Sequence, residues 1–113
     1  VQVVGIEPAS SPLITQGRSG AHGLQGIGAN FIPANYDLQW VDAVLTVTEE
    51  EAFAMARLLA QTEGVLNGIT AGAALAASVR LLQMPENAGK TLVAVLPDSG
   101  DRYYSTPIFP QQG

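Results

Sequence analysis

Residues 41–64 read VDAVLTVTEEEAFAMARLLAQTEG and predict a strand that leads directly into a helix. Val41–Val47 is rich in β-branched residues, which strands favour. Thr48 and Glu51 have the spacing of a capping box, in which Thr48 accepts from the third helical N–H and Glu51 reaches back. Apolar positions then recur at helical spacing until Gly64, a natural helix stop. These apolar positions are Ala52, Phe53, Ala56, Leu59 and Ala60.

The flanking segments repeat this alternation of strand and helix. Val1–Ile6 predicts a strand covered on both faces and ended by Pro8. After a turn over Gly68–Gly72, Ala73–Met84 predicts a buried helix closed by a proline, and Thr91–Leu96 predicts a third apolar strand. Strands separated by helices pair in parallel. We therefore expect an α/β fold, a three-layer sandwich with a mostly parallel sheet, that binds ligands at the carboxyl ends of its strands.

The composition favours one small domain and excludes several kinds of partner. The 113 residues include 10 Asp+Glu and only 5 scattered Lys+Arg, a net charge of −5, which disfavours nucleic acid and anionic membrane. The absence of cysteine excludes disulfides, thiolate metal sites and a cysteine nucleophile. No apolar run is long enough to span a bilayer, so a cytoplasmic protein is the default expectation. A chain that opens at Val1 inside a strand reads as a fragment or as a trimmed domain.

Three polar or glycine-rich stretches are candidates for a site. Gly68–Ala74 (GITAGAA) opens a helix with small residues, which offers backbone amides and room for a flat ligand; alternatively Thr70 is an N-cap and the small residues allow close helix packing. Gln25–Phe31 (QGIGANF) contains paired glycines and an Asn30 that tolerates a left-handed backbone, so it borders a substrate or is a structural turn. Leu96–Tyr103 (LPDSGDRY) follows the third strand, but Asp98 and Asp101 are too few for a metal site, so a capped surface turn is the alternative.

Two further residues have low functional expectations. His22 lies in the long loop over residues 15–30 with no candidate ligand or nucleophile near it in sequence. Lys90, the single lysine, precedes a strand, at the edge of the sheet where sites seldom lie, and is interpreted as a surface charge.

Taken together and in order, five segments resemble the C-terminal third of cysteine synthase, or O-acetylserine sulfhydrylase, and of its relative cystathionine β-synthase. The segments are VVGIEP (3–8), QGIGANFIP (25–33), GITAGAA (68–74), ENAGKT (86–91) and LPDSGDRYYST (96–106). The resemblance covers almost the whole chain. It implies a fold-type II enzyme whose cofactor is pyridoxal 5'-phosphate, and it makes residues 1–113 one segment, the C-terminal part of the larger cofactor-binding domain.

The resemblance also implies an activity, which is the conversion of O-acetyl-L-serine and sulfide to L-cysteine and acetate by β-replacement. In the family a hydroxyl residue meets the pyridine nitrogen of the cofactor, and Thr70 matches it. Asp98 and Ser99 match a turn close to the cofactor ring. Gly26, Gly28 and Ala29 match the loop that borders the substrate.

Departures from the family limit what the segment can do. Thr70-Ala71 replaces the common Ser-Ser, and Asn30 replaces a frequent glycine. The family's Schiff-base lysine, substrate-carboxylate loop and phosphate loop all precede the matched region, and Lys90 does not match the missing lysine. We therefore expect no catalytic residue in this segment and no activity without the N-terminal portion of the enzyme.

Alternatives and partners follow from the same resemblance. The enzyme could instead use homocysteine, as cystathionine β-synthase does, or O-phosphoserine as the donor. A different class of function is a non-catalytic module that binds a small ligand. The family resemblance further suggests a homodimer and, in some members, a complex with serine acetyltransferase.

Overall fold

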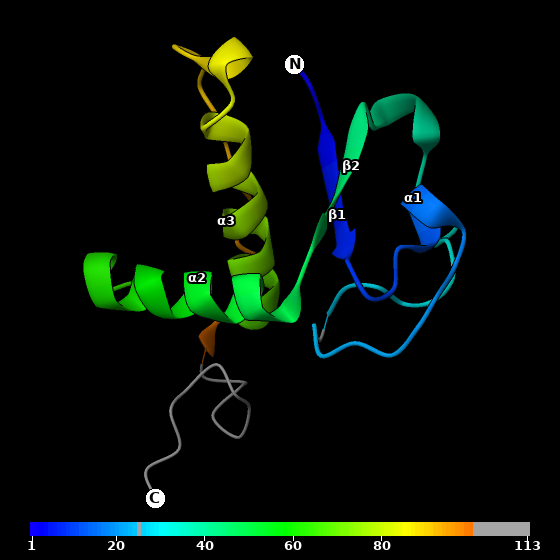
Figure 1. Ribbon diagram of the computed structural model, residues 1–113, viewed down its shortest axis with the longest axis horizontal. Helices are drawn as coiled ribbons and strands as arrows, with labels where there is room; N and C mark the ends of the chain where they lie inside the picture. The colour runs from blue at the N-terminus through cyan, green and yellow to red at the C-terminus, as the bar shows by residue number, and fades with distance from the viewer. Residues whose placement is uncertain (25, 101–113) are drawn as a thin grey trace, which may run out of the picture.

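The computed structural model describes residues 1–24 and 26–100, and Figure 1 shows how they are arranged. Two strands, β1 (Val4–Pro8) and β2 (Ala43–Val47), pair in parallel with their first residues opposite each other. The predicted parallel pairing is confirmed for these two strands. The first strand was predicted over Val1–Ile6 but runs from Val4 to Pro8. Val1, where the predicted strand began, is fully exposed.

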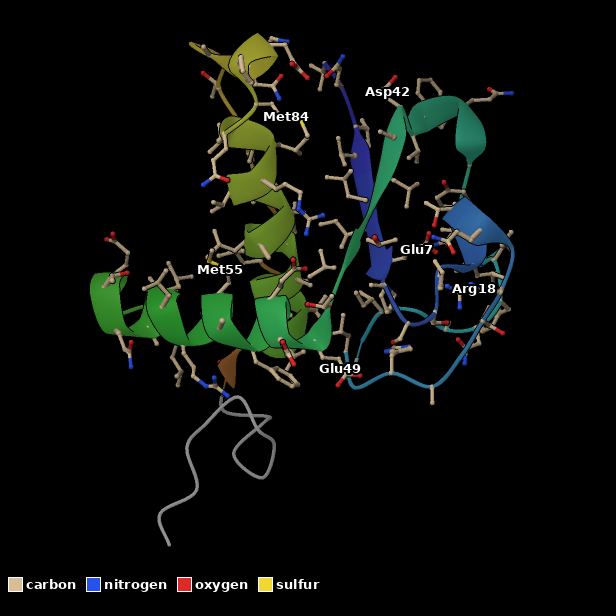
Figure 2. All side chains as sticks on the ribbon, in the orientation of Figure 1. Glu7, Arg18, Asp42, Glu49, Met55 and Met84 are labelled. Atoms are coloured by element: carbon tan, nitrogen blue, oxygen red, sulfur yellow. The ribbon has the colours of Figure 1, made fainter. Side chains whose placement is uncertain are left out.

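The carboxyl end of β1 is tied to a short helix, α1 (Leu13–Gln16). The buried Glu7 carboxylate accepts hydrogen bonds of 2.8 Å from the backbone N–H groups of Ile14 and Thr15. Glu7 points from β1 toward this side of the molecule in Figure 2. Because these two N–H groups have no partner within their own helix, Glu7 stabilises the turn that follows the strand.

Helix α2 (Glu49–Glu63) has the boundaries that its sequence predicts. Thr48 Oγ1 accepts from Glu51 N at 3.1 Å, and Glu51 Oε2 accepts from Thr48 N at 2.9 Å, so the capping box is formed. Gly64 ends the helix in the left-handed conformation, with φ of 68°. Ala52 and Ala56 on its predicted apolar face are buried.

Helix α3 (Ile69–Leu82) begins four residues earlier than predicted, so the expected turn over Gly68–Gly72 is wrong. Its N-cap is Gly68, and Thr70 lies inside the first turn, so the alternative of Thr70 as N-cap is also wrong. The first turn also packs closely against α2. A Cβ on Gly72 would overlap the carbonyl oxygen of Ala52, so only glycine lets α3 approach α2 here.

The third predicted strand is not formed among the described residues. Thr91–Leu96 has no strand assignment, and Val93 and Val95 are 87% and 76% exposed. A strand forms only when a neighbouring strand takes up its backbone hydrogen bonds, and no described strand pairs with these residues. In Figure 1 this orange segment runs behind α3.

The core lies where the two helices meet each other and the end of the sheet. It is built mainly from alanines of α2 and α3, which suit closely packed helices. Its buried members are Leu24, Val47, Ala52, Ala56, Ile69, Ala73, Ala76 and Ala77. Two 3-10 turns, at Leu38–Trp40 and Pro85–Asn87, complete the elements. Within the described part of the chain, no helix combines the length and apolar character needed to cross a membrane.

Candidate functional site

The N-terminus of α3 is held by a carboxylate from the far end of the chain. Asp98 Oδ1 accepts from Ala71 N at 2.8 Å and Oδ2 accepts from Thr70 N at 3.1 Å. The Asp98 carbonyl also accepts from Gly68 N at 3.2 Å. Because the helix dipole favours a negative charge at this end, Asp98 acts as a remote cap. The expectation that these first-turn amides stay open for a ligand is therefore wrong for Thr70 and Ala71.

Ser99 continues the same connection. It forms an isolated antiparallel bridge with Asn67, the buried residue just before the N-cap of α3. Asn67 in turn donates from Nδ2 to the carbonyl oxygens of Ala56 and Val65, at 3.1 and 3.3 Å. The turn after residues 91–96 is thus fastened to the start of α3, which fixes where Thr70 lies.

Gly26 brings the second candidate stretch against the first. A Cβ built on Gly26 would lie 2.6 Å from Thr70 Oγ1, and its φ is 105°, a conformation that side chains rarely allow. The backbone of Gly26 therefore covers the Thr70 hydroxyl at a distance that only glycine permits. Gly26 and Thr70, which are 44 residues apart in sequence (70 − 26), lie side by side here.

His22 organises the same loop through both ring nitrogens. Leu24 N donates to Nδ1 at 3.1 Å, so Nδ1 carries no proton, and Nε2 lies 2.7 Å from the carbonyl oxygen of Gly28. The ring is therefore the neutral tautomer that donates from Nε2. Gly28 has φ of 63°, and a Cβ there would meet Pro8 and His22 at 2.5 and 2.6 Å. His22 therefore links the start of this loop to Gly28.

Two further residues of this loop, Ala29 and Asn30, were also named by the sequence analysis. Asn30 has φ of 63°, which confirms the predicted left-handed backbone, and its side-chain oxygen accepts from Ser11 at 2.6 Å. Ala29 is exposed. Gly26 and Gly28 thus make close contacts, Gly26 with Thr70 and Gly28 with Pro8 and His22.

A hollow of about 200 Å³ lies where these segments converge. Its lining is apolar apart from one hydroxyl, that of Thr70, and consists of Ile6, Ile27, Thr70, Ala73, Ala74, Val95 and Pro97. Pockets for small ligands usually measure about 300–1,000 Å³. The hollow therefore supplies one wall and one polar group for a flat ligand, rather than a complete pocket.

No charged residue among those that the structure describes lines this hollow. Arg80 donates to Thr46 O at 2.8 Å and forms an ion pair of 3.1 Å with Glu51, which ties α3 to the end of β2 and the start of α2. The Thr48 backbone N–H, together with Arg80, lowers the pKa of Glu51, although burial opposes this in part. In the part of the chain that the structure describes, no three His, Cys, Asp or Glu residues gather as a metal site would require.

The sequence analysis named Thr70, Asp98, Gly26 and Gly28 as candidates, and the structure adds two residues that hold neighbouring loops. Glu7 and His22 act through backbone hydrogen bonds, which no motif in the sequence announces. A carboxylate at the carboxyl end of a buried strand was the one available signal for Glu7. Gln25 and residues 101–106, with Asp101 and Arg102, lie outside the described residues.

Comparison with known proteins identifies the chain's relatives. A family model described as "Pyridoxal-phosphate dependent enzyme" matches residues 1–98. Cysteine synthase A of Escherichia coli is 47% identical over 112 residues, which cover 94% of this chain and 35% of that protein. The chain thus spans about a third of the length of the curated relatives it matches.

Solved structures agree with these relatives. The crystal structure of cysteine synthase from Entamoeba histolytica has a TM-score of 0.93 and 36% identity, covering all of this chain and 34% of that one. An O-acetylserine dependent cystathionine β-synthase from Helicobacter pylori has a TM-score of 0.82 and 36% identity, covering 97% of this chain and 35% of that one.

Proposed function

Because this chain belongs to the family of pyridoxal-phosphate dependent enzymes, we propose that it is the C-terminal segment of a cysteine synthase. The complete enzyme makes L-cysteine and acetate from O-acetyl-L-serine and sulfide by β-replacement. The segment is inactive alone, in keeping with its match to only 35% of the length of its bacterial relative. Residues 1–113 then form the C-terminal part of the larger, cofactor-binding domain.

One observation carries the proposal, namely that Thr70 lines the hollow and lies against the backbone of Gly26. A side chain on Gly26 would fill the space directly over the Thr70 hydroxyl. The rest of this wall is apolar or small, with Ala73 and Ala74 on the helix side. A flat aromatic ring with one acceptor nitrogen fits such a wall, and pyridoxal 5'-phosphate has such a ring.

The cofactor, when bound, withdraws electrons from the amino acid attached to it. Thr70 would donate its hydroxyl proton to the pyridine nitrogen. A neutral hydroxyl keeps its proton, so the ring nitrogen stays largely uncharged, unlike a nitrogen that faces a carboxylate. Ile27, Ala73 and Ala74 would hold the ring plane and exclude water from it. Asp98 would position Thr70 by capping the turn that carries it.

The phosphate group of the cofactor needs a different location. The amides of Thr70 and Ala71 are already bonded to Asp98, whose negative charge would repel a phosphate. We infer that a loop outside this segment holds the phosphate, and that the reactive lysine also lies outside it. Gly26, Gly28 and Ala29 would border the substrate, with His22 holding their loop closed.

The test joins this chain to the part of Escherichia coli cysteine synthase A that it does not match. We expect the fusion to absorb visible light as a cofactor-loaded enzyme and to form cysteine from O-acetyl-L-serine only when sulfide is present. The 113-residue chain alone, handled identically, should be colourless and inactive. A soluble, folded fusion that binds no cofactor would refute the proposal.

A second candidate differs only in the nucleophile. The similarity to a cystathionine β-synthase from Helicobacter pylori, with a TM-score of 0.82, favours testing homocysteine in place of sulfide. O-phosphoserine belongs in the same panel as an alternative donor. Preference for homocysteine by more than about tenfold in kcat/KM, or about 1.4 kcal/mol, would reassign the enzyme.

The proposal extends to assembly and location. The complete enzyme would be a cytoplasmic homodimer, and some family members also bind serine acetyltransferase. Light scattering of the fusion, with and without serine acetyltransferase, tests both associations.

A further inference from the structure

Residues 91–96 already have the side-chain pattern of a strand, although they are not in a sheet. Leu92 and Ala94 are half-buried, whereas Val93 and Val95 are 87% and 76% exposed. Alternation with a period of two is the signature of an extended segment with one face on a core. Four apolar residues in a row, two of them almost fully exposed, indicate a surface that is covered in the complete protein.

Strand β1 has an open edge that faces the same region. Among the described residues its single strand neighbour is β2. Ala43 N donates to Val3 O, and Ala9 N donates to Val47 O, so the odd-numbered residues of β1 direct their backbone groups at β2. Because neighbouring residues of a strand point to opposite edges, Val4 and Ile6 direct theirs at the open edge.

A cavity of about 900 Å³ separates these two edges. Val1–Val4 and Ile6 line one side, and Thr91–Val95 lines the other. The floor is a stripe of α3 with helical spacing, formed by Ala74, Ala77, Ser78 and Leu81. Figure 2 shows the side chains of α3 and β1 directed toward each other across this space. The cavity is therefore bounded by α3 below, by the open edge of β1 on one side and by residues 91–95 on the other.

We propose that this cavity receives one β-strand from the part of the fold that the relatives have and this chain does not span. The strand pairs in parallel with β1 on one side and with residues 91–96 on the other. This completes the sheet whose third strand was predicted but not formed. The inference takes the identity of the donor from the proposed function.

Three observations select a strand over other occupants. Both side walls present backbone groups that need partners, which an inserted helix cannot supply because its own groups are internally bonded. The lining is largely apolar, as it is around a strand buried on both faces. About two thirds of the length of the relatives lies outside this segment, which leaves ample chain to provide the strand.

The experiment mixes the 113-residue chain with the part of Escherichia coli cysteine synthase A that it does not match, without cofactor or substrate. Amide hydrogen exchange is then measured residue by residue. In the mixture, the amides of Val4 and Ile6 should exchange more slowly by a factor of about ten or more, together with alternate amides of residues 91–96. Gly5 and Glu7 face β2 and should change little, which makes them the internal control.

A matched pair of variants tests the backbone pairing itself. Val4→Pro removes one donor from the open edge, whereas Val4→Thr keeps the donor and the β-branched shape. The proline variant should bind the added protein about tenfold more weakly, the effect of one lost hydrogen bond, and the threonine variant should bind like the original.

Three outcomes would overturn the inference: no binding, binding without protection of Val4 and Ile6, or equal binding by the two variants. The same protection in the chain alone, with a doubled mass, would assign the cavity to a second copy and also overturn it. The proposed function fails separately: if the complex protects these amides but makes no cysteine once pyridoxal 5'-phosphate, O-acetyl-L-serine and sulfide are added, the activity is refuted and the strand stays in place.

Discussion

Asp98 and Thr70, which are 28 residues apart in sequence, are joined at the first turn of α3 by a hydrogen bond of 3.1 Å from the Thr70 backbone N–H to Oδ2. The bond fixes the turn after residues 91–96 to α3, the helix that carries the Thr70 hydroxyl. A substitution at Asp98 or in the first turn of α3 should therefore affect both segments.

Asp98→Ala should destabilise α3 because the remote cap is lost. We expect the free energy of unfolding to fall by about 1–2 kcal/mol, as for other lost N-caps. Asp98→Asn keeps one side-chain oxygen that can accept a hydrogen bond, so this variant should lose less stability. Urea unfolding followed by circular dichroism checks the order, and an alanine variant as stable as the asparagine variant would contradict the cap.

Thr70→Ala in the complete enzyme should leave the cofactor bound and slow turnover. The hydroxyl partner of the ring nitrogen is lost, whereas the group that attaches the cofactor lies outside this segment. One lost hydrogen bond corresponds to about tenfold in kcat. Thr70→Ser retains the hydroxyl and should recover most of the rate. Unchanged turnover in the alanine variant would show that Thr70 does not contact the ring.

Gly26→Ala should disturb the site, because the new Cβ would stand 2.6 Å from Thr70 Oγ1. Gly17 is the matched control, since its φ of 71° is also positive but nothing lies within 4 Å of the place that a Cβ would take. Gly17→Ala should cost only the backbone strain, about 1–2 kcal/mol. In the fusion enzyme, Gly26→Ala alone should weaken cofactor binding, measured by titration of the visible absorbance. If both variants weaken cofactor binding equally, the contact between Gly26 and Thr70 has no special role in that binding.

His22 can be divided into its two contacts by substitution. Asparagine places its oxygen near the position of Nδ1 and can keep the bond from Leu24 N, whereas glutamine reaches toward the Gly28 carbonyl in place of Nε2. We expect His22→Ala to raise KM for the amino-acid substrate by about tenfold, because the loop loses both bonds. The KM values of His22→Asn and His22→Gln should lie between those of His22→Ala and of the unchanged enzyme. If KM stays constant while kcat falls, His22 acts in some way other than holding this loop.

Glu51 makes stability depend on pH in the acid range. The Thr48 N–H and Arg80 lower its pKa, so folding favours the ionised carboxylate. This contribution is fully present above about pH 4.3, the ordinary value for glutamate, and is lost as the pH falls through the lower folded value. Because the Glu51 side chain is 45% exposed, Glu51→Gln should cost only about 0.5 kcal/mol at about pH 7. The difference between the two proteins in urea unfolding should shrink as the pH falls below about pH 4.3, and a constant difference would contradict the linkage.

Local signals in the sequence predicted the elements that depend on local interactions. The capping box at Thr48 and the stop at Gly64 use groups within one helix, so the boundaries of α2 were predictable. The start of α3 was missed because its cap comes from Asp98, far along the chain. The strand at 91–96 was predicted from its apolar residues, but strand formation requires a neighbour, and propensity does not reveal whether one is present.

The candidate site divides in the same way. The sequence analysis expected Gly26 and Gly28 to let the backbone lie against a substrate, and the structure gives both a positive φ. That Gly26 lies against Thr70 could not be predicted, because the contact depends on how a long loop returns across the end of the sheet. His22 was undervalued for a related reason, since its partners are backbone groups that every residue possesses.

The parallel pairing of β1 with β2 also has a consequence for the order of folding. Val3 N donates to the Asp42 carboxylate across 39 residues of chain, and closing a loop of that length costs about 3 kcal/mol of entropy before any contact forms. The two helices are neighbours in sequence and carry no such cost. Pulse-labelled hydrogen exchange during refolding should therefore find α2 and α3 protected first, with the strands captured later by a helical pair that has already formed.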